Sequence, residues 1–471
     1  MSNGAAGKAG EHAIAESTVN AFRAQIRGAL IRLGDPEYDS ARKVYNGMID
    51  KRPSMIVCCV DVADVIRAVN FARENSLTLA IRGGGHNGPG LGTCDRGLVI
   101  DLGRMKGVRV EPATATVRVE GGCVWGDVDH ATHPFGLAVP CGFISTTGVG
   151  GLTLGGGVGY LTRRCGLTID NLLGVDIVLA DGRFVTVSER ENSDLFWAVR
   201  GGGGNFGVVT SFHFRAHSVK TVYGGPIFWP LEQARDILRY WSNLVLTAPD
   251  ELNGWFGFVT VPPVPPFPQE HHLKKMCVIC WCYSGDLAQA EQVFKPIRQF
   301  RSPLIDFAGP VAFPALNSMF DALYPKGLQW YWRADFFEEI NDRAVDLHLK
   351  YAAQLPTPFS TMHLYPVSGA ARRIGKAETA WNYRNANFAE VIVGVDPDPA
   401  NNERMTQWAK DYWASLHPHS LGGAYLNMIM DEGEDQVRAA YGENYSRLAK
   451  IKAKYDPKNL FSVNQNIKPA G

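Results

Sequence analysis

A histidine at the end of a glycine run is the feature of this sequence most suited to chemistry. Residues 79–87 read Leu-Ala-Ile-Arg-Gly-Gly-Gly-His-Asn, so a short apolar stretch ends in three glycines and delivers His86 directly after them. Glycine lets a backbone approach a ligand with no side chain in between, and successive backbone N–H groups form a concavity that binds anions. We therefore expect this loop to lie against a diphosphate, with the imidazole beside whatever group the diphosphate carries.

Two glycine patterns, at 83–88 and 202–207, match the dinucleotide-binding sequence GxGxxG. In a nucleotide-binding βαβ unit the last glycine opens a helix, and an acidic residue follows about 20 positions later. The first pattern is followed by the Pro- and Gly-rich stretch 89–92, which cannot continue a helix, and the second by the β-rich run 208–214. The sequence therefore disfavours a dinucleotide-binding Rossmann unit.

Length and charge narrow the class of protein further. A chain of 471 residues is too long for one ordinary core and predicts two or three domains. Lys plus Arg equals Asp plus Glu at 47 each, so no net field attracts nucleic acid or an anionic membrane. No stretch approaches the roughly 18 apolar residues of a membrane helix, and the first residues lack the apolar core of a secretory signal. We expect a cytoplasmic protein without nucleic-acid or membrane partners, either a monomer or a homodimer.

The cysteines do not indicate a disulfide framework or a metal site. Nine cysteines is an odd number, and they are scattered along the chain. Cys277, Cys280 and Cys282 are spaced closely enough to suggest a metal, but they lie in the β-rich run 276–282, and no second ligand pair follows at zinc spacing. We expect them to be small apolar residues of a buried strand, and we predict no metal.

The amino-acid composition and the predicted secondary structure of the chain change near residue 217. Before it, a helical pattern at 61–69 and strand-like runs at 98–102 and 117–119 are separated by glycine-rich turns. After it, the chain is rich in aromatic residues and contains nine of the eleven tryptophans. The proline-rich segment 261–268 is expected to be an irregular loop, because proline cannot donate to a strand ladder.

Longer motifs follow one another along nearly the whole chain. They are Arg-Gly-Gly-Gly-His-Asn at 82–87, Pro-Cys-Gly at 140–142, the glycine-rich run 147–160, Gly-Leu-Thr-Ile-Asp-Asn at 166–171, the run 195–209, Tyr-Asp-Pro-Lys-Asn-Leu-Phe at 455–461 and Asn-Gln-Asn-Ile at 464–467. In this order they resemble the berberine-bridge-enzyme-like branch of FAD-linked oxidases, which has the vanillyl-alcohol-oxidase fold. The resemblance spans about 38–469 and is nearest to bacterial members.

The resemblance implies an α+β protein with the two-domain PCMH-type (VAO-like) FAD-binding fold and an antiparallel-sheet substrate domain. We expect 1–19 to be a disordered N-terminus, 20–216 together with 431–471 to hold FAD, and 217–430 to bind the substrate. The returning segment contains an acidic-start helix near 434–438. The pocket is expected where the two domains meet.

The resemblance also implies that His86 is bonded to the 8α-methyl carbon of FAD. A neutral imidazole is a nucleophile near physiological pH, which suits this role. Doubly tethered members add a cysteine in the pattern Gly-x-Cys-Pro-Thr-x-Gly, where this chain has Ile144, with Cys141 three residues earlier. We therefore expect a single 8α-histidyl link, with Cys141 lining the pocket as a free thiol.

Further cofactor contacts follow from the same resemblance. The run from Gly148 to Gly159 is suited to pass flat against the cofactor, and asparagine amides suit the flavin edge because they both donate and accept. A helix cap or a turn is the alternative role for Asn464 and Asn466. The expected cofactor residues are Arg82, Gly83, Gly84, Gly85, His86, Asn87, Pro140, Cys141, Thr146, Thr147, Gly148, Gly150, Gly151, Leu154, Gly157, Asn171, Gly207, Val208, Asn427, Asn464 and Asn466.

The catalytic base is harder to assign. Plant members of the family use a glutamate, whose counterpart by spacing is Arg373 here, so that carboxylate is missing. Carbohydrate-oxidising members use the tyrosine of a Tyr-x-Asn motif, present here at 425–427, and a phenol with a pKa of about 10 needs help to ionise. We expect Tyr425 to be the base or an orienting group, with a core tyrosine as the alternative. Other aromatic residues are expected as catalytic side chains or pocket walls, unless they belong to the core: Tyr160, Tyr383, Trp332 and Tyr365.

The reaction implied by the resemblance removes a proton from a substrate O–H or N–H while the adjacent C–H delivers hydride to FAD. O₂ then reoxidises the cofactor and gives H₂O₂. The aromatic second domain indicates a small aromatic or hydrophobic substrate. Two alternatives stay open: a natural-product tailoring flavoenzyme that cyclises or oxygenates its substrate, and a flavin-carrying binding protein without turnover.

Overall fold

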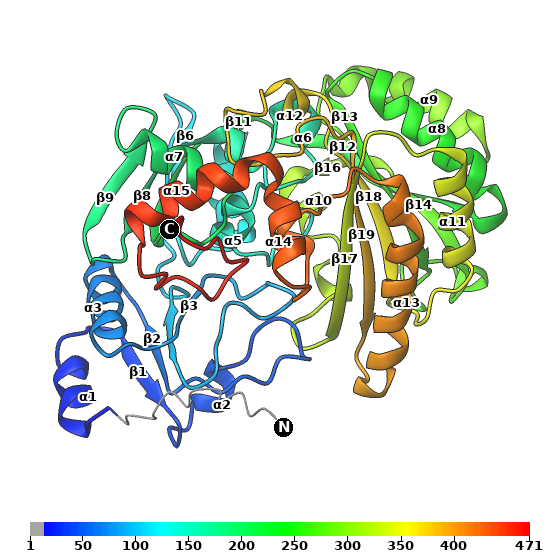
Figure 1. Ribbon diagram of the computed structural model, residues 1–471. Helices are drawn as coiled ribbons and strands as arrows, with labels where there is room; N and C mark the ends of the chain where they lie inside the picture. The colour runs from blue at the N-terminus through cyan, green and yellow to red at the C-terminus, as the bar shows by residue number, and fades with distance from the viewer. Residues whose placement is uncertain (1–13) are drawn as a thin grey trace.

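The computed structural model describes residues 14–471 and consists of two halves side by side (Figure 1). Residues 1–13 of the predicted disordered segment lie outside the described residues. The rest of that prediction is wrong, because helix α1 (Glu16–Arg23) packs Val19 and Phe22 into the core, and Phe22 stacks on Phe71 with ring centroids 4.1 Å apart. Three-residue spacing of apolar side chains puts them on one helix face.

The first half begins with a four-stranded sheet in the order β1-β2-β4-β3. Its strands are β1 (Ala29–Arg32), β2 (Met55–Cys58), β3 (Leu79–Arg82) and β4 (Leu98–Asp101), of which β2, β4 and β3 are parallel. Helix α3 (Val62–Glu74) packs on this sheet and is capped by Asp61, whose carboxylate accepts the backbone N–H of Asp64. The predicted helix at 61–69 and strand at 98–102 are thus confirmed. The glycine run follows at the carboxyl end of β3.

A second, antiparallel sheet has the order β5-β6-β10-β8-β9. Its strands are β5 (Val108–Glu111), β6 (Thr116–Glu120), β8 (Leu172–Val178), β9 (Phe184–Ser188) and β10 (Val208–Arg215). Strand β10 starts directly after Gly207, and no helix follows Gly88, so neither GxGxxG match opens a helix. Short elements complete this half: α2 (Tyr38–Ala41), α4 (Trp125–Thr132), α5 (Val149–Leu154), α6 (Thr162–Cys165), α7 (Ser193–Val199) and the paired strands β7 (Leu137–Ala138) and β11 (His217–Ser218).

The second half is an eight-stranded antiparallel sheet in the order β15-β12-β14-β13-β18-β19-β17, with β16 beside β12. The strands are β12 (Thr221–Pro230), β13 (Leu252–Thr260), β14 (Lys275–Tyr283), β15 (Ile305–Asp306), β16 (Gly309–Ala312), β17 (Gln329–Phe337), β18 (Thr361–Pro366) and β19 (Phe388–Asp396). The helices of this half are α8 (Ala234–Thr247), α9 (Ala290–Phe300), α10 (Phe313–Asn317), α11 (Asp342–Ala352), α12 (Ala370–Arg373) and α13 (Asn402–Leu416).

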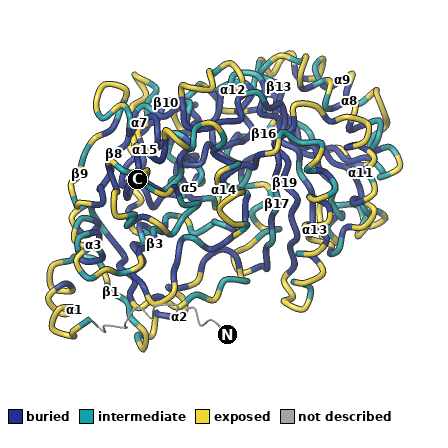
Figure 2. The backbone as a smooth tube through the Cα atoms, viewed as in Figure 1, coloured by how far each residue is buried: buried dark blue, intermediate teal, exposed yellow. Residues whose placement is uncertain are grey.

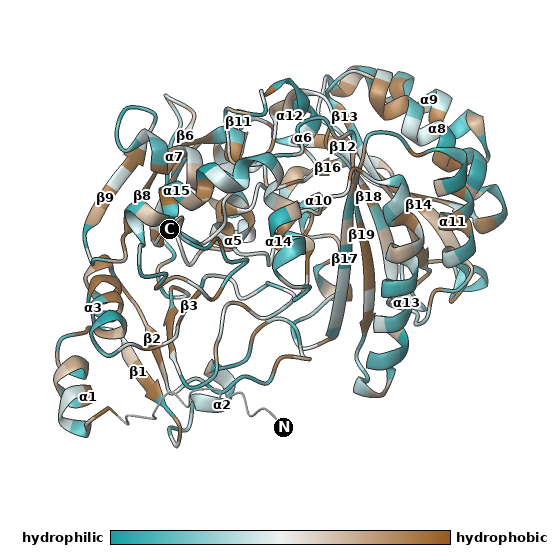
Figure 3. Ribbon diagram, in the orientation of Figure 1, coloured by the Kyte–Doolittle hydropathy of each residue, from teal (hydrophilic) through white to brown (hydrophobic). Residues whose placement is uncertain are grey.

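The two faces of this sheet have different neighbours. Helices α8, α11 and α13 pack on one face, and Figures 2 and 3 show exposed, hydrophilic outer surfaces on these helices over buried, hydrophobic strands. Successive side chains of a strand point to opposite faces. On β14 this sends Cys277 into the helix-side core and Cys280 and Cys282 into the core of the other face, so the three cysteines are buried apolar residues, as predicted.

Within residues 14–471 no group of three or more His, Cys, Asp or Glu side chains is arranged to hold a metal ion. None of the helices in this range combines the length and the apolar composition that a membrane-spanning helix requires. The segment 261–268 contains neither helix nor strand, as its prolines predict.

The C-terminal segment returns from the large sheet to the first half (Figure 1). Helix α14 (Glu434–Tyr441) confirms the predicted acidic-start helix, and α15 (Tyr445–Tyr455) follows it. The buried Lys452 ammonium donates to the Asp456 carboxylate at 2.6 Å and to the backbone carbonyls of Asn205 and Phe461 at 2.6 and 2.9 Å. A buried charge is tolerated when it is paired and fully hydrogen-bonded, so these contacts fasten the end of the chain beside β10.

Candidate active site

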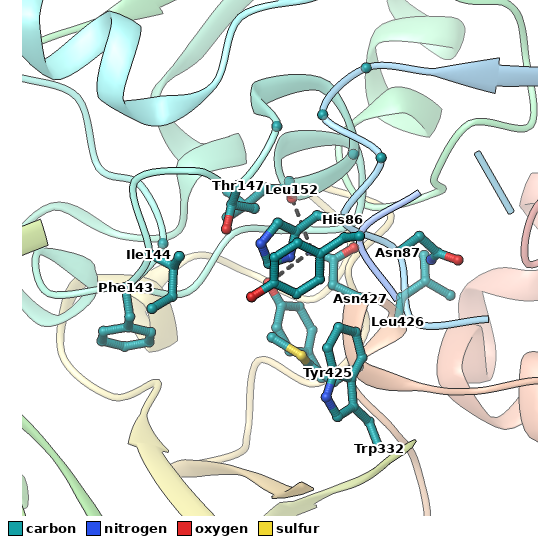
Figure 4. A pocket seen from close by; sticks show the side chains of 18 of the residues that line it. His86, Asn87, Phe143, Ile144, Thr147, Leu152, Trp332, Tyr425, Leu426 and Asn427 are labelled. Carbon is teal, nitrogen blue, oxygen red and sulfur yellow. Dashed lines mark hydrogen bonds between the residues drawn. The ribbon is translucent and has the colours of Figure 1, made fainter. Parts of the chain in front are cut away.

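A cavity of about 380 Å³ lies between the glycine run after β3 and the large sheet. One wall consists of glycine-rich backbone from 83–85, 148–151 and 203–207, together with the C-terminal segment 463–465. The opposite wall consists of aromatic side chains, which include Trp255, Trp330, Trp332 and Tyr365. Figure 4 shows His86, Asn87 and Thr147 from the first half gathered near Trp332 and Tyr425.

The glycine wall is built from two backbones in direct contact. A Cβ atom on Gly84 would lie 2.6 Å from the Cα of Gly148, and one on Gly148 would lie 2.5 Å from the backbone N of Gly84. Atoms at such distances overlap, and backbone cannot move aside as a flexible side chain can. Only glycine at both positions lets the two segments pass so closely, which leaves bare backbone facing the cavity.

Several polar atoms at this wall are buried and have no partner in the protein. They are Arg82 Nη1, His86 Nε2, Asn464 Oδ1 and Gln465 Nε2. Buried polar atoms are almost always hydrogen-bonded, so these donors and acceptors are placed for a ligand. Arg82 also pairs with Asp101 at 2.8 Å, which holds the guanidinium in place. A cradle of bare backbone with one cationic group and several amides fits the diphosphate and the polar edge of FAD.

His86 sits at the end of this wall in a fixed orientation. Its ring stacks on Tyr45 with centroids 3.7 Å apart and an interplanar angle of 20°. Burial lowers the pKa of His86 to about 4, so the imidazole is neutral at physiological pH. A neutral imidazole with a nitrogen lone pair is a nucleophile, and protonation would remove that reactivity.

Tyr425 presents its phenol oxygen to three N–H donors. The backbone N–H groups of Gly157 and Val158 donate to it at 3.1 and 3.2 Å, and the Asn427 side-chain amide donates at 3.0 Å. Burial raises the pKa of Tyr425, and the three hydrogen bonds act in the opposite direction because they favour the ionised oxygen. Asn427 is held by a second bond to the carbonyl of Leu152 at 3.0 Å, and both side chains line the cavity (Figure 4).

Comparison with known proteins agrees with this geometry. Residues 53–188 match a family model described as an FAD binding domain, and residues 424–468 match one described as berberine and berberine like. The chain is 33% identical over 460 residues to an FAD-linked oxidoreductase of Dictyostelium discoideum, with 97% of this chain and 98% of the relative covered. The chain belongs to the berberine-like family of FAD-linked oxidoreductases.

Other members extend the comparison. The (R)-6-hydroxynicotine oxidase of Paenarthrobacter nicotinovorans is 29% identical over 463 residues, covering 95% of this chain and 98% of the relative. The crystal structure of 6-hydroxy-D-nicotine oxidase from Arthrobacter nicotinovorans has a TM-score of 0.84 and 27% identity over 94% of this chain and 98% of that one. A chitooligosaccharide oxidase, with a TM-score of 0.82 and 23% identity over 96% of this chain and 100% of that one, shares the fold. The predicted α+β, VAO-like architecture and the assignment as an FAD-linked oxidoreductase are confirmed.

Most of the predicted site residues of this berberine-like oxidoreductase surround the cavity. The lining includes Arg82, Gly83, Gly84, Gly85, His86, Asn87, Thr147, Gly148, Gly150, Gly151, Leu154, Gly207, Tyr425, Asn427 and Asn464. Trp332 and Tyr365, expected as pocket walls, also line it. The lining does not include Pro140, Cys141, Thr146, Gly157, Tyr160, Asn171, Val208, Tyr383 and Asn466.

The two other tyrosines predicted as catalytic are not brought to the cavity. The Tyr383 hydroxyl donates to the carbonyl of Ala439 at 2.6 Å, and the Tyr160 hydroxyl lies 3.3 Å from the Cys280 sulfur. Asn171 donates to two carbonyls of its own turn, those of Cys165 and Leu167, both at 2.9 Å. Each of these side chains has hydrogen-bond partners inside the protein. For Tyr160 and Tyr383 this is the core role that remained open, whereas Asn171 was expected only as a cofactor residue.

Cys141 is buried away from the cavity, contrary to the expectation that it lines the pocket. Its sulfur lies 3.2 Å from the side-chain amide nitrogen of Asn317, and burial raises the pKa of the thiol well above its usual range. A thiol in this state is a poor nucleophile. Ile144 does line the cavity, and in the described chain none of the lining residues is a cysteine.

Sequence reasoning missed several residues of the aromatic wall. His363, Tyr324, Phe320 and Trp255 line the cavity, as does Tyr45, whose ring covers His86. The alternation of Thr361, His363 and Tyr365 with apolar residues was a readable signal, because it places the three on one face of a strand. Tyr45 carries no such local pattern.

Proposed function

We propose that this berberine-like oxidoreductase is an oxidase that carries FAD through a single covalent link to His86. The observation that carries the proposal is the buried, unpartnered Nε2 of a neutral imidazole at the end of the glycine wall. The absence of cysteine from the described cavity lining supports one link instead of two. When bound, FAD accepts a hydride from the substrate carbon and returns the electrons to O₂, which forms H₂O₂.

Tyr425 is the proposed base. Its oxygen takes the proton from a substrate O–H or N–H, and the N–H groups of Gly157, Val158 and Asn427 stabilise the ionised phenol, as preorganised donors stabilise other oxyanions. Because these N–H groups occupy the lone pairs of the oxygen, a neutral phenol directs its own hydrogen away from them, and we infer that this direction is into the cavity. Tyr425 therefore faces the substrate in either protonation state.

The test of the link is precipitation of the purified protein with acid. We expect a yellow pellet from the wild-type chain and a colourless pellet from His86→Ala, with the released flavin in the supernatant. Cys141→Ala is the matched control and is expected to keep its colour, because Cys141 is not among the residues that line the cavity. A pellet of His86→Ala that stays yellow would contradict the proposal.

The test of oxidase activity is substrate-dependent H₂O₂ formation, paired with anaerobic bleaching of the flavin by aromatic alcohols, cyclic amines and sugars. Bleaching without H₂O₂ on admission of air would identify a dehydrogenase. A product that gains oxygen or a new ring would instead support the tailoring reaction.

A further inference from the structure

Strand β18 carries a continuous hydrogen-bond chain along its cavity face. Thr361 Oγ1 donates to the backbone carbonyl of Phe258 at 2.7 Å and lies 2.9 Å from His363 Nε2. His363 Nδ1 lies 2.7 Å from the Tyr365 hydroxyl. The three side chains alternate with Met362 and Leu364, which pack into the helix-side core.

The backbone carbonyl fixes the direction of every bond in this chain. A carbonyl only accepts, so the Thr361 hydroxyl must give its hydrogen to Phe258 and can only accept from His363. His363 therefore carries its hydrogen on Nε2 and offers a lone pair at Nδ1. The Tyr365 hydroxyl must donate to that lone pair, which leaves only lone pairs of the Tyr365 oxygen toward the cavity.

The protonation state of His363 preserves this arrangement. Burial lowers the pKa of His363 to about 3, so the ring stays neutral and Nδ1 remains an acceptor. The groups that face it are the neutral Thr361 and Tyr365 and the ring of Trp255, with centroids 4.5 Å apart. Burial also raises the pKa of Tyr365, so its hydrogen stays on the oxygen.

The surroundings of Tyr365 are aromatic and uncharged. Phe143 stacks on its ring with centroids 4.5 Å apart and an interplanar angle of 16°, and Phe320 and Trp332 also line the cavity. Arg82 is the only Lys, Arg, Asp or Glu side chain in the lining within residues 14–471, and it belongs to the glycine wall, paired with Asp101. A charged substrate would lose its hydration here without gaining a counter-ion.

We propose that Tyr365 accepts a hydrogen bond from an O–H or N–H of an uncharged aromatic substrate, and that His363 and Thr361 are positioning residues that fix this polarity. The inference rests on the proposed oxidase function and names its substrate class. A ligand that offers only an acceptor at this point would bring one lone pair against another. Loss of one such hydrogen bond lowers affinity about tenfold.

The test is equilibrium binding to the flavin-loaded protein, measured by titration calorimetry with 2-naphthol, 2-methoxynaphthalene and 2-acetylnaphthalene. The wild-type protein is expected to bind 2-naphthol about tenfold more tightly than its methyl ether, because only the naphthol donates a hydrogen bond. Tyr365→Phe is expected to bind the two equally. Tyr160→Phe is the matched control, because its hydroxyl lies outside the cavity, and it is expected to keep the preference.

A variant of His363 separates positioning from a merely structural role. In His363→Leu the Tyr365 hydroxyl loses its acceptor and is free to donate into the cavity. The acceptor-only 2-acetylnaphthalene is then expected to gain affinity while the preference for 2-naphthol shrinks. A general loosening of the site would weaken all three ligands together and would contradict the positioning role.

Other outcomes overturn the inference directly. Equal affinity of the wild-type protein for 2-naphthol and its methyl ether, or a preference that survives in Tyr365→Phe, would contradict the acceptor assignment. Failure of all three naphthalenes to bind would contradict the aromatic substrate class. Flavin content of the same samples separates the two proposals: a covalently loaded protein without the preference contradicts this inference alone, and a protein without flavin contradicts the proposed function.

Discussion

The two walls of the cavity are built on opposite principles. The glycine wall is backbone, and its essential property is the absence of side chains where Gly84 meets Gly148. The aromatic wall consists of side chains, and its properties come from the order in which strands place them on one face. A ligand that many relatives share can be held by backbone geometry, whereas a ligand particular to one enzyme needs side chains that can differ.

A similar contrast holds for two of the tyrosines that line the cavity, Tyr425 and Tyr365. The Tyr425 oxygen accepts three N–H bonds and so directs its own hydrogen outward, whereas the Tyr365 hydrogen is committed to His363. One phenol thus offers a hydrogen or an ionised oxygen, and the other offers lone pairs. The same residue type takes two roles because of its neighbours.

The largest effect, on flavin binding, is expected from adding one carbon to the glycine wall. Gly84→Ala places a methyl group against the Gly148 backbone and forces the two segments apart, so we expect no bound flavin. Absorbance of the purified protein near 450 nm measures this loss. Gly309→Ala is the matched control, because a Cβ there meets no atom within 4 Å. Normal flavin loading of Gly84→Ala would show that the close backbone contact is unnecessary.

Removing the proposed base is the next largest change. Tyr425→Phe keeps the ring and loses the oxygen, so we expect the rate of anaerobic flavin reduction to fall about 10²–10⁴-fold, the usual contribution of general-base catalysis. Stopped-flow spectroscopy measures this rate, and covalent flavin content is expected to stay normal. Tyr383→Phe serves as the control, since its hydroxyl bonds to the Ala439 carbonyl. An unchanged rate of flavin reduction in Tyr425→Phe would show that another group removes the substrate proton.

A smaller effect is expected from a tyrosine outside both walls. Tyr160→Phe removes a buried hydroxyl that lies 3.3 Å from the Cys280 sulfur and 3.4 Å from the Trp255 indole nitrogen. We expect a loss of about 1 kcal/mol in the free energy of unfolding, typical of one buried hydrogen bond, with flavin reduction unchanged. Denaturant unfolding and stopped-flow reduction measure the two quantities. If the rate of flavin reduction changed while the free energy of unfolding did not, Tyr160 would be a catalytic residue after all.

The last prediction is that the preference for 2-naphthol over its methyl ether does not change with pH. The pKa of His363 is lowered from 6.5 to about 3, so the ring binds no proton between pH 8 and pH 5 and the polarity of the chain to Tyr365 persists. The ratio of affinities for 2-naphthol and 2-methoxynaphthalene should therefore be equal at the two pH values. A ratio that collapses through pH 6.5 would show that His363 becomes a double donor, which would reverse the Tyr365 hydroxyl.

The glycine wall could be predicted from the sequence, because the effect of a glycine on how closely the backbone can approach a ligand does not depend on distant residues. A glycine run lets the backbone approach a ligand closely wherever it lies in the fold, and Gly84, His86 and Gly148 line the cavity as expected. The aromatic wall could not be predicted in the same way. Tyr160 and Tyr383 have the same side chain as Tyr365, and only the sheet register and the packing of distant segments decide which of them faces the cavity.

The strand at 361–365 lies between these cases. Its alternation of polar and apolar residues was visible, but its pairing with β13, which supplies the Phe258 carbonyl, depends on residues about 100 positions away. For Cys141 the local sequence motif led to a wrong prediction. Its place in the motif suggested the pocket, and the amide of Asn317, far along the chain, holds it elsewhere.

The buried Lys452 has a consequence for the order of assembly. It fastens the segment around Phe461 beside β10, and residues 463–465, which follow directly, form part of the glycine wall. The cavity is thus enclosed only once this segment has docked beside Asn205, and under the proposed function the flavin would be loaded in step with that docking.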